Sequence, residues 1–164
     1  MVTAGERHDL IAKIQRLPAV VEAAVKDLND AQLNTPYRQG GWTVRQVVHH
    51  LADSHLNGFV RMKLMLTEAR PTLKPYDQDS WAKLPDTADF AIQSSLVILR
   101  GLHERWTVLL QNMSEASWSR SAFHLEVGEV TLDDLLVEYA RHGEDHVAQI
   151  TTLSGRQKDG ERAT

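Results

Sequence analysis

Apolar residues recur every three or four positions along most of this 164-residue chain, whereas the two-residue alternation of a half-buried strand is nearly absent. This spacing is the period of an amphipathic α-helix. Glycine and proline cluster between the periodic stretches, where they mark connections. The pattern predicts an all-α fold, with a single domain over residues 1–155 and a polar, frayed C-terminal tail over 156–164.

Four long helical segments joined by long loops predict a four-helix bundle. We expect Pro18 to break the first segment, because proline lacks the backbone donor that a helix interior needs. Thr43 and Gln46 fit a capping box that starts the second segment. Thr131 is the expected N-cap of the last segment, and Gly155 its stop. The segments cover residues 6–28, 43–69, 89–113 and 131–155.

Two connections have recognisable local patterns. Residues 71–86 contain three prolines and are predicted to form a loop with one short helical turn around Trp81. Residues 119–130 are the one place where a β-hairpin is expected, because apolar residues alternate there before a glycine. The alternating residues and the glycine are Phe123, Leu125, Val127 and Gly128.

Charge and hydropathy exclude two classes of partner. The chain has 18 basic and 22 acidic residues, a formal net charge of −4 and no dense basic run, so a nucleic-acid-binding surface is not expected. It has no apolar signal core and no apolar run long enough for a membrane span. We expect a cytoplasmic protein that binds neither nucleic acid nor a membrane.

Eight histidines and no cysteine set the chemistry that the chain can offer. A transition-metal site would have to be built from imidazole and carboxylate groups. His142 and His146 are four residues apart on the last predicted helix, so both side chains project from one face and can reach one metal ion. Two partly buried histidines that hydrogen-bond to carboxylates or to the backbone would have the same spacing.

A third ligand could come from the second predicted helix, which carries His49, His50 and His55. His55 lies at the centre of the apolar stripe, so burial favours it. His49 is expected to point toward solvent. His50 lies at the edge of the stripe, where an open catalytic site would need it, beside Ser54, Asn57 and Arg61. Periodicity leaves the choice between His50 and His55 open.

Other polar and aromatic residues are candidates for the rest of a site. No catalytic residue is assigned beyond a metal-bound water; Asp53, one turn after His50, and Arg45 are the candidates for a catalytic role. Arg45, Arg61 and Arg105 could clamp an anionic substrate, although a surface arginine more often pairs with a neighbouring acid. Four aromatic residues could wall a pocket or pack the end of the bundle: Tyr37, Trp42, Tyr76 and Trp81. Three histidines are expected to be structural or surface residues: His8, His103 and His124.

The segment from Tyr37 to His55, with the sequence YRQGGWTVRQVVHHLADSH, resembles the signature of the DinB/YfiT-like family of metal-dependent hydrolases. Later segments are similar to the YfiT branch of this family, so the resemblance covers nearly the whole chain. They are Lys74-Pro75-Tyr76-Asp77, His103-Glu104-Arg105-Trp106, and Tyr139-Ala140-Arg141-His142 with His146.

This resemblance implies an up-down-down-up four-helix bundle, commonly a homodimer, with a divalent metal ion held by three histidines. Zinc is the first expectation for the metal and nickel the second. The implied ligands are His50, which follows Trp42 by eight residues, together with His142 and His146. The resemblance thus overrules the burial argument for His55. The chain departs from the family pattern in its last segment, where histidines for proton transfer are replaced by Glu144, Asp145 and Gln149.

The function implied is hydrolysis of a small-molecule substrate by a water on the metal, whose pKa the ion lowers. The same site could serve a transferase or isomerase that uses a low-molecular-weight thiol as cofactor. Since the chain has no cysteine, that thiol would supply the nucleophile. A third alternative is a non-catalytic, metal-binding, stress-responsive dimer.

Overall fold

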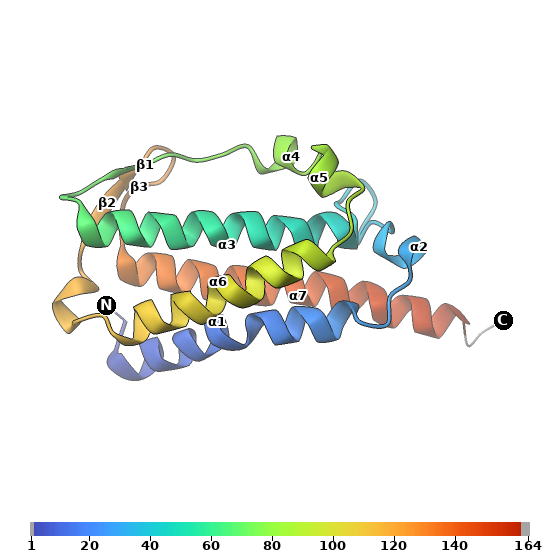
Figure 1. Cartoon of the computed structure of the whole chain (residues 1–164), viewed down its shortest axis with the longest axis horizontal. Coiled ribbons are helices and arrows are strands. Elements are labelled where there is room, and N and C mark those ends of the chain that lie inside the picture. Colours follow the sequence, from blue (N-terminus) through green and yellow to red (C-terminus); the bar gives the residue numbers. More distant parts are fainter. Residues whose placement is uncertain (1, 162–164) are drawn as a thin grey trace.

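A computed structural model describes residues 2–161, with side chains described up to residue 152, and four long helices dominate it (Figure 1). They are α1 (Ala4–Val25), α3 (Val44–Thr67), α6 (Gln93–Gln111) and α7 (Leu132–Glu161). The shorter helices are α2 (Asp30–Leu33), α4 (Gln78–Trp81), α5 (Pro85–Ala88) and the 3-10 helix η1 (Glu115–Ser117). Within residues 2–161, the helices lack an apolar stretch that could cross a bilayer.

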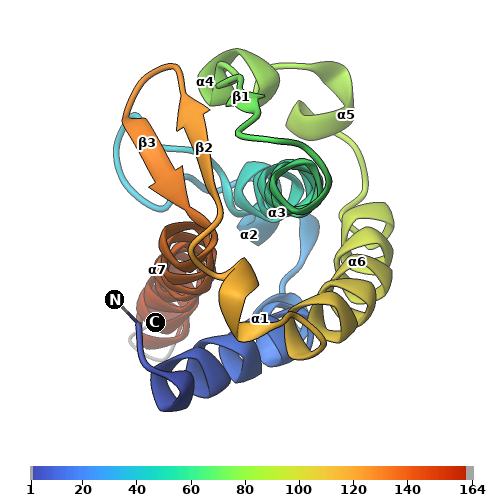
Figure 2. The same ribbon diagram turned by 90° about the vertical axis from the view of Figure 1, so that its left-hand side faces the viewer.

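The helix directions match the expected up-down-down-up bundle. In Figure 1, α1 and α7 run one way, and α3 and α6 run the other way. Because α3 and α6 are consecutive long helices that are parallel, the connection between them must return along the bundle. Both α1 and α3 pack against α6 and α7, which places α1 and α3 on opposite corners of the bundle (Figure 2).

A three-stranded sheet joins two of the loops. The predicted hairpin is confirmed: β2 (Ser121–His124) and β3 (Gly128–Thr131) pair antiparallel, and Gly128 has a φ of 84°. A third strand, β1 (Thr72–Leu73), was not predicted and pairs parallel with β2. A two-residue strand is too short to leave an alternating pattern, and β1 is held by backbone hydrogen bonds from residues 123 and 125.

The core consists of two apolar clusters that follow each other along the bundle. One centres on Trp106 and includes Phe59, and the other includes Leu51 and Leu99. On α7, the first cluster reaches Ala140 and the second begins again at residue 147, and both metal-site candidates of α7 fall between them. The candidate site therefore lies in a polar layer between two packed apolar regions.

The predicted break of the first helix at Pro18 is wrong, because α1 is continuous with Pro18 inside it. Proline at position 18 leaves the carbonyl of Ile14 without its helical donor. His103 of α6 supplies the missing hydrogen bond, with its Nδ1 atom 2.6 Å from the Ile14 oxygen. The helix continues because a buried side chain from another helix replaces the lost backbone donor.

The predicted stop at Gly155 is also wrong, since α7 continues to Glu161. A glycine inside a helix costs only about 1 kcal/mol relative to alanine, and the arginine, glutamine and lysine that follow are good helix formers. Most of the expected frayed tail is therefore helical, and its last residues, 162–164, lie outside the described residues.

Candidate metal centre

Three histidines meet where α3 faces α7. The capping box of Thr43 and Gln46 is present and starts α3 at the predicted position, which places His50 in the second turn of the helix. His142 and His146 lie one turn apart on α7. The structure thus brings together the three histidines that the resemblance implied.

The spacing of the three rings suits a single metal ion. The Nε2 atom of His142 lies 3.1 Å from Nε2 of His50 and 3.1 Å from Nε2 of His146. One ring nitrogen from each residue lies within 4.8 Å of the others. With metal–nitrogen bonds of about 2.0–2.1 Å, two imidazole ligands of one ion have nitrogens about 3.0–3.4 Å apart. Both separations from His142 fall in this range.

Burial keeps these imidazoles in the neutral form that binds metals. Burial, followed by the charges of the neighbouring His146 and His142, lowers the pKa of His50 to about 3. Burial, followed by the charge of His146, likewise lowers the pKa of His142 to about 3. The pKa of His146 is also lowered, mainly by burial. At neutral pH all three ring systems therefore offer a free lone pair.

Two of the rings have a hydrogen-bond partner for Nδ1, on the side away from the cluster. His146 Nδ1 lies 2.9 Å from Oε1 of Gln149, an oxygen that can only accept, so Nδ1 donates and Nε2 is free. His142 Nδ1 lies 3.3 Å from Nε2 of His55. A proton on His142 Nδ1 likewise leaves its Nε2 free to face the other two residues. Such outer hydrogen bonds orient histidine ligands in metal sites.

Trp42 covers the cluster from the loop before α3. Its ring stacks on His146 at 7° with centroids 6.4 Å apart, and its centroid is 4.6 Å from that of His50. The indole Nε1 donates to Oδ1 of Asp79, in the first turn of α4, at 3.1 Å. Trp42 therefore packs against the rings of His50 and His146, and its hydrogen bond to Asp79 holds it in place.

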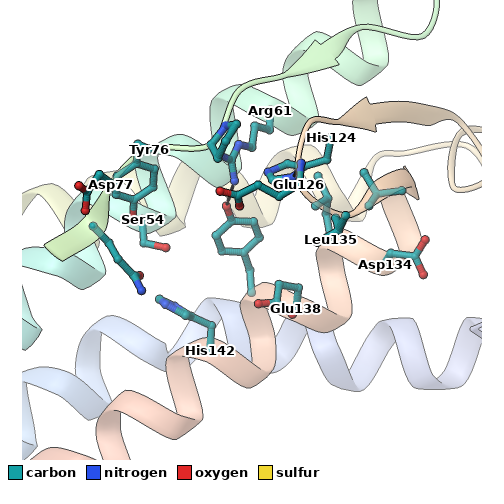
Figure 3. Close-up of a pocket in the computed structure, with 15 residues that line it drawn as sticks. Ser54, Arg61, Tyr76, Asp77, His124, Glu126, Asp134, Leu135, Glu138 and His142 are labelled. Carbon is teal, nitrogen blue, oxygen red and sulfur yellow. Dashed lines mark hydrogen bonds between the residues drawn. The ribbon is translucent and has the colours of Figure 1, made fainter. Parts of the chain in front are cut away.

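Two cavities meet at the cluster. The larger, about 750 Å³, lies between α3, α7 and the β2–β3 hairpin, and Figure 3 shows His142 and Glu138 on one side of it with Tyr76 and Arg61 on the other. The smaller, about 580 Å³, is lined by His142, His146 and the loop that carries Trp42. Both are lined by Gln78, Glu138 and His142. Small molecules can thus approach the cluster from two directions.

Of the two other histidines of α3, neither belongs to the cluster. His55 is fully buried behind His142, in agreement with the burial argument, and its ring stacks on His103 at 4.9 Å. The expectation that His49 points toward solvent is wrong: it is buried, 2.7 Å from Oγ of Ser95 and 3.0 Å from the carbonyl oxygen of Phe90. Helical periodicity predicted that this face of α3 is exposed to solvent, but Phe90, before α6, and Ser95, in its first turn, cover it.

The two candidates for a catalytic role have different surroundings. Arg45 is buried and binds Asn34, the carbonyl of Phe90 and, as an ion pair, Asp30. It therefore joins α2 and the connection before α6 to α3. Asp53 is half-buried, and burial, followed by the charge of Asp86, raises its pKa to about 6. Its catalytic role stays a prediction.

The aromatic residues expected to wall a pocket divide between the two cavities. Tyr37 and Trp42 line the smaller cavity and Tyr76 the larger, with Trp81 packed on Tyr76 at 4.5 Å. The contact of Gln149 with His146 was not predicted from the sequence. The position of Gln149 three residues after His146 was the available signal, because residues at this spacing are neighbours on a helix.

Comparisons with known proteins agree with this geometry. The model of the DinB superfamily matches residues 13–150. A protein of Geobacillus kaustophilus is 48% identical over 155 residues, covering 94% of this chain and 87% of the relative. YfiT of Bacillus subtilis is 43% identical over 156 residues, covering 94% and 88%. Their names provisionally assign both relatives to the metal-dependent hydrolases.

The solved structure of Bacillus subtilis YfiT superposes with a TM-score of 0.94 at 42% identity, covering 96% of this chain and 91% of that one. It is described as having an unusual four-helix bundle topology. Sequence and structure therefore agree over nearly the whole length, and this chain belongs to the DinB superfamily.

Proposed function

We propose that the protein is a metal-dependent hydrolase in which His50, His142 and His146 hold one divalent ion. The observation that carries this proposal is the convergence of three neutral ring nitrogens at metal-binding separation. Zinc before nickel, a homodimer and a cytoplasmic location are further parts of the proposal that rest on the family resemblance.

A divalent ion held by these three imidazoles would supply water of lowered pKa, about 7, and would polarise the carbonyl oxygen of a substrate. The protein's own residues position this chemistry. Gln149 and His55 orient two of the rings, and Trp42 holds the third from the side. Glu138 is exposed and borders both cavities next to His142, where its carboxylate can accept a proton from water or substrate.

A second candidate function uses a low-molecular-weight thiol as nucleophile. Cavities of about 750 and 580 Å³ meet at His142, and hydrolysis needs room for only one organic molecule. A transferase needs room for a thiol and an electrophile together, and the two cavities supply it. Since the chain has no cysteine, the sulfur would have to come from the cofactor.

Metal content tests the site. Tag-free protein prepared with sufficient metal should contain close to one zinc or nickel per chain, and less than about 0.2 would contradict the site. His50→Ala, His142→Ala and His146→Ala should each lose the metal. His8→Ala is the matched control, because His8 is exposed on α1 and its removal should leave the metal content unchanged.

Activity separates the candidate reactions. Metal-loaded protein should hydrolyse members of an ester and amide panel, and Glu138→Gln should slow turnover while keeping the metal. Acceleration of a reaction between an electrophile and one small thiol, without hydrolysis, would contradict the hydrolase and support the transferase. A fully loaded protein without either activity would support a non-catalytic metal-binding dimer.

A further inference from the structure

Arg61 is the one cationic side chain among the described residues that line the larger cavity. It projects from α3, three helical turns after His50. Figure 3 shows it on the wall opposite the α7 residues Glu138 and His142. The cavity thus has the candidate metal centre in one part and a guanidinium group in another.

The guanidinium is held in place without a charged partner. Its Nη1 donates to the hydroxyl of Tyr139 at 3.2 Å, and its Nη2 donates to the carbonyl of Lys74 at 2.8 Å. Both acceptors are neutral, and among the described side chains no carboxylate forms an ion pair with Arg61. Two of its donors thus fix its position, and the others are left for a ligand.

The carboxylates of the cavity are engaged elsewhere or stand in water. Asp77 accepts hydrogen bonds from Ser80 as the N-cap of α4, and Asp134 accepts them from Thr131 at the start of α7. Glu126 and Glu138 are exposed. The negative charges of these two exposed carboxylates repel a dianion more strongly than a singly charged anion, so a ligand held by Arg61 is expected to carry a single negative charge.

His124 adds a second donor beside Arg61. Its Nδ1 atom accepts a hydrogen bond from the backbone nitrogen of Glu126 at 3.3 Å, which leaves the proton of the neutral ring on Nε2. His124 is half-buried and lines the same cavity. The wall opposite α7 thus carries two nitrogen donors and a hydroxyl, that of Tyr76.

We propose that this cavity binds the carboxylate end of a small-molecule substrate at Arg61, with the reacting group toward His142. The orientation of the substrate, with its reacting group at His142, rests on the proposed function. The binding of a carboxylate at Arg61 does not depend on that function. It narrows the substrate class to esters, amides or electrophiles that carry a carboxylate away from the reacting bond.

Hexanoate, its neutral analogue hexanamide and pentyl phosphate serve as probes in NMR titrations of the metal-free and the zinc-loaded protein. Hexanoate should bind both forms and shift signals of cavity residues, while hexanamide should not compete. Arg61→Met should weaken hexanoate binding by about tenfold or more, because a charge-assisted hydrogen bond is lost. Arg61→Lys keeps the charge but not the planar fork, and should weaken binding by about threefold.

Arg105→Met is the matched control, since Arg105 lies exposed over the ring of Phe59 and outside the cavity. Its affinity for hexanoate should stay within about twofold of the wild-type value. Equal binding by wild type and Arg61→Met, no binding by the wild type, or tighter binding of pentyl phosphate would overturn the inference. If His50→Ala loses zinc but still binds hexanoate, the subsite stands independently of the metal centre. If the wild type binds zinc but not hexanoate, the metal centre stands and the carboxylate subsite at Arg61 does not.

Discussion

The Nε2 atom of His55 lies 3.3 Å from the Nδ1 atom of His142, so a fully buried histidine stands directly behind a member of the three-histidine cluster. With its Nε2 as a metal ligand, as proposed, His142 carries its proton on Nδ1 and donates it to Nε2 of His55. The Nδ1 atom of His55 then has no hydrogen-bond partner among the described residues. Retaining this unpaired buried group costs free energy, which is consistent with a role in positioning His142.

We predict that His55→Phe weakens zinc affinity by about 10- to 100-fold, because His142 loses the acceptor that fixes its ring. Competition with a chromophoric chelator measures the affinity, and the visible spectrum of the cobalt-loaded protein should change with the altered ligand geometry. His55→Gln restores an acceptor oxygen and should lose less affinity. His49→Phe, which removes a buried histidine from the same helix, should leave the spectrum unchanged.

Two results would contradict this role. Unchanged affinity in His55→Phe would make His55 a packing residue only. Complete loss of metal in His55→Phe, with full metal content in His50→Ala, would make His55 the ligand and would restore the argument from burial.

The sequence predicts those features that depend on residues close together in the chain. The capping box of Thr43 and Gln46, the hairpin before Gly128 and the i,i+4 pair of His142 and His146 are all local patterns, and all are present. Helical periodicity also predicts correctly that His55 is buried.

The features that sequence reasoning missed depend on contacts between distant segments. His103 donates to the carbonyl of Ile14, which Pro18 leaves without a helical donor. His103 and Ile14 are 89 residues apart in the chain, so no local pattern reveals this donor. His49 is buried because the connection into α6 crosses its face of α3. Periodicity predicts on which face of a helix a residue lies, but it does not predict which segments pack against that face. The choice of His50 over His55 as the ligand therefore came only from the family resemblance.

Gly58 allows Tyr139 to lie against α3, and this gives a second prediction. A Cβ atom at position 58 would lie 2.6 Å from Cε2 of Tyr139, and Tyr139 in turn holds Arg61. Gly58→Ala should therefore lower the free energy of unfolding by about 1–3 kcal/mol through overpacking. Chemical denaturation measures the change.

Gly101 provides the control for Gly58, because it also lies inside a long helix but a Cβ atom added there would meet no other atom within 4 Å. Gly101→Ala should stabilise the protein by about 0.5–1 kcal/mol through helix propensity. A stabilising Gly58→Ala variant would show that Tyr139 can move aside without cost.

Arg7 and Asp133 form a buried pair that joins α1 to the start of α7. Arg7 donates through Nε at 2.7 Å and through Nη2 at 2.9 Å to the two oxygens of Asp133, and both residues are buried. Arg7→Met should cost about 3–5 kcal/mol of unfolding free energy, because it leaves Asp133 charged and unpaired. Urea denaturation measures the cost.

Arg7→Met combined with Asp133→Leu should cost less than Arg7→Met alone, since no charge is left buried. Glu115→Gln is the control within the same cluster: Glu115 also pairs with Arg7 but its side chain is 78% exposed, so the cost should stay below about 1 kcal/mol. A double variant less stable than the single one would contradict this account.

Stability should fall as the pH drops below about 6.5, in part because of His103. Burial lowers the pKa of His103, and its hydrogen bond to Ile14 opposes this effect in part, so that the resulting pKa is about 4. With a pKa near 6.5 when unfolded, the residue binds a proton in the unfolded state first. Its contribution is therefore fully present above pH 6.5 and is lost as the pH falls toward 4. Each such proton changes the unfolding free energy by about 1.4 kcal/mol per pH unit.

His103→Asn tests this assignment, because the asparagine Nδ2 can replace the histidine Nδ1 as donor to Ile14 but does not titrate. Urea denaturation at several pH values between 7.5 and 4.5 should give a shallower loss of stability in the variant, by up to one proton. The remaining dependence of the unfolding free energy on pH comes from the other buried histidines. An identical slope in wild type and variant would mean that His103 takes up no proton on unfolding, and that its hydrogen bond to Ile14 offsets the cost of burial.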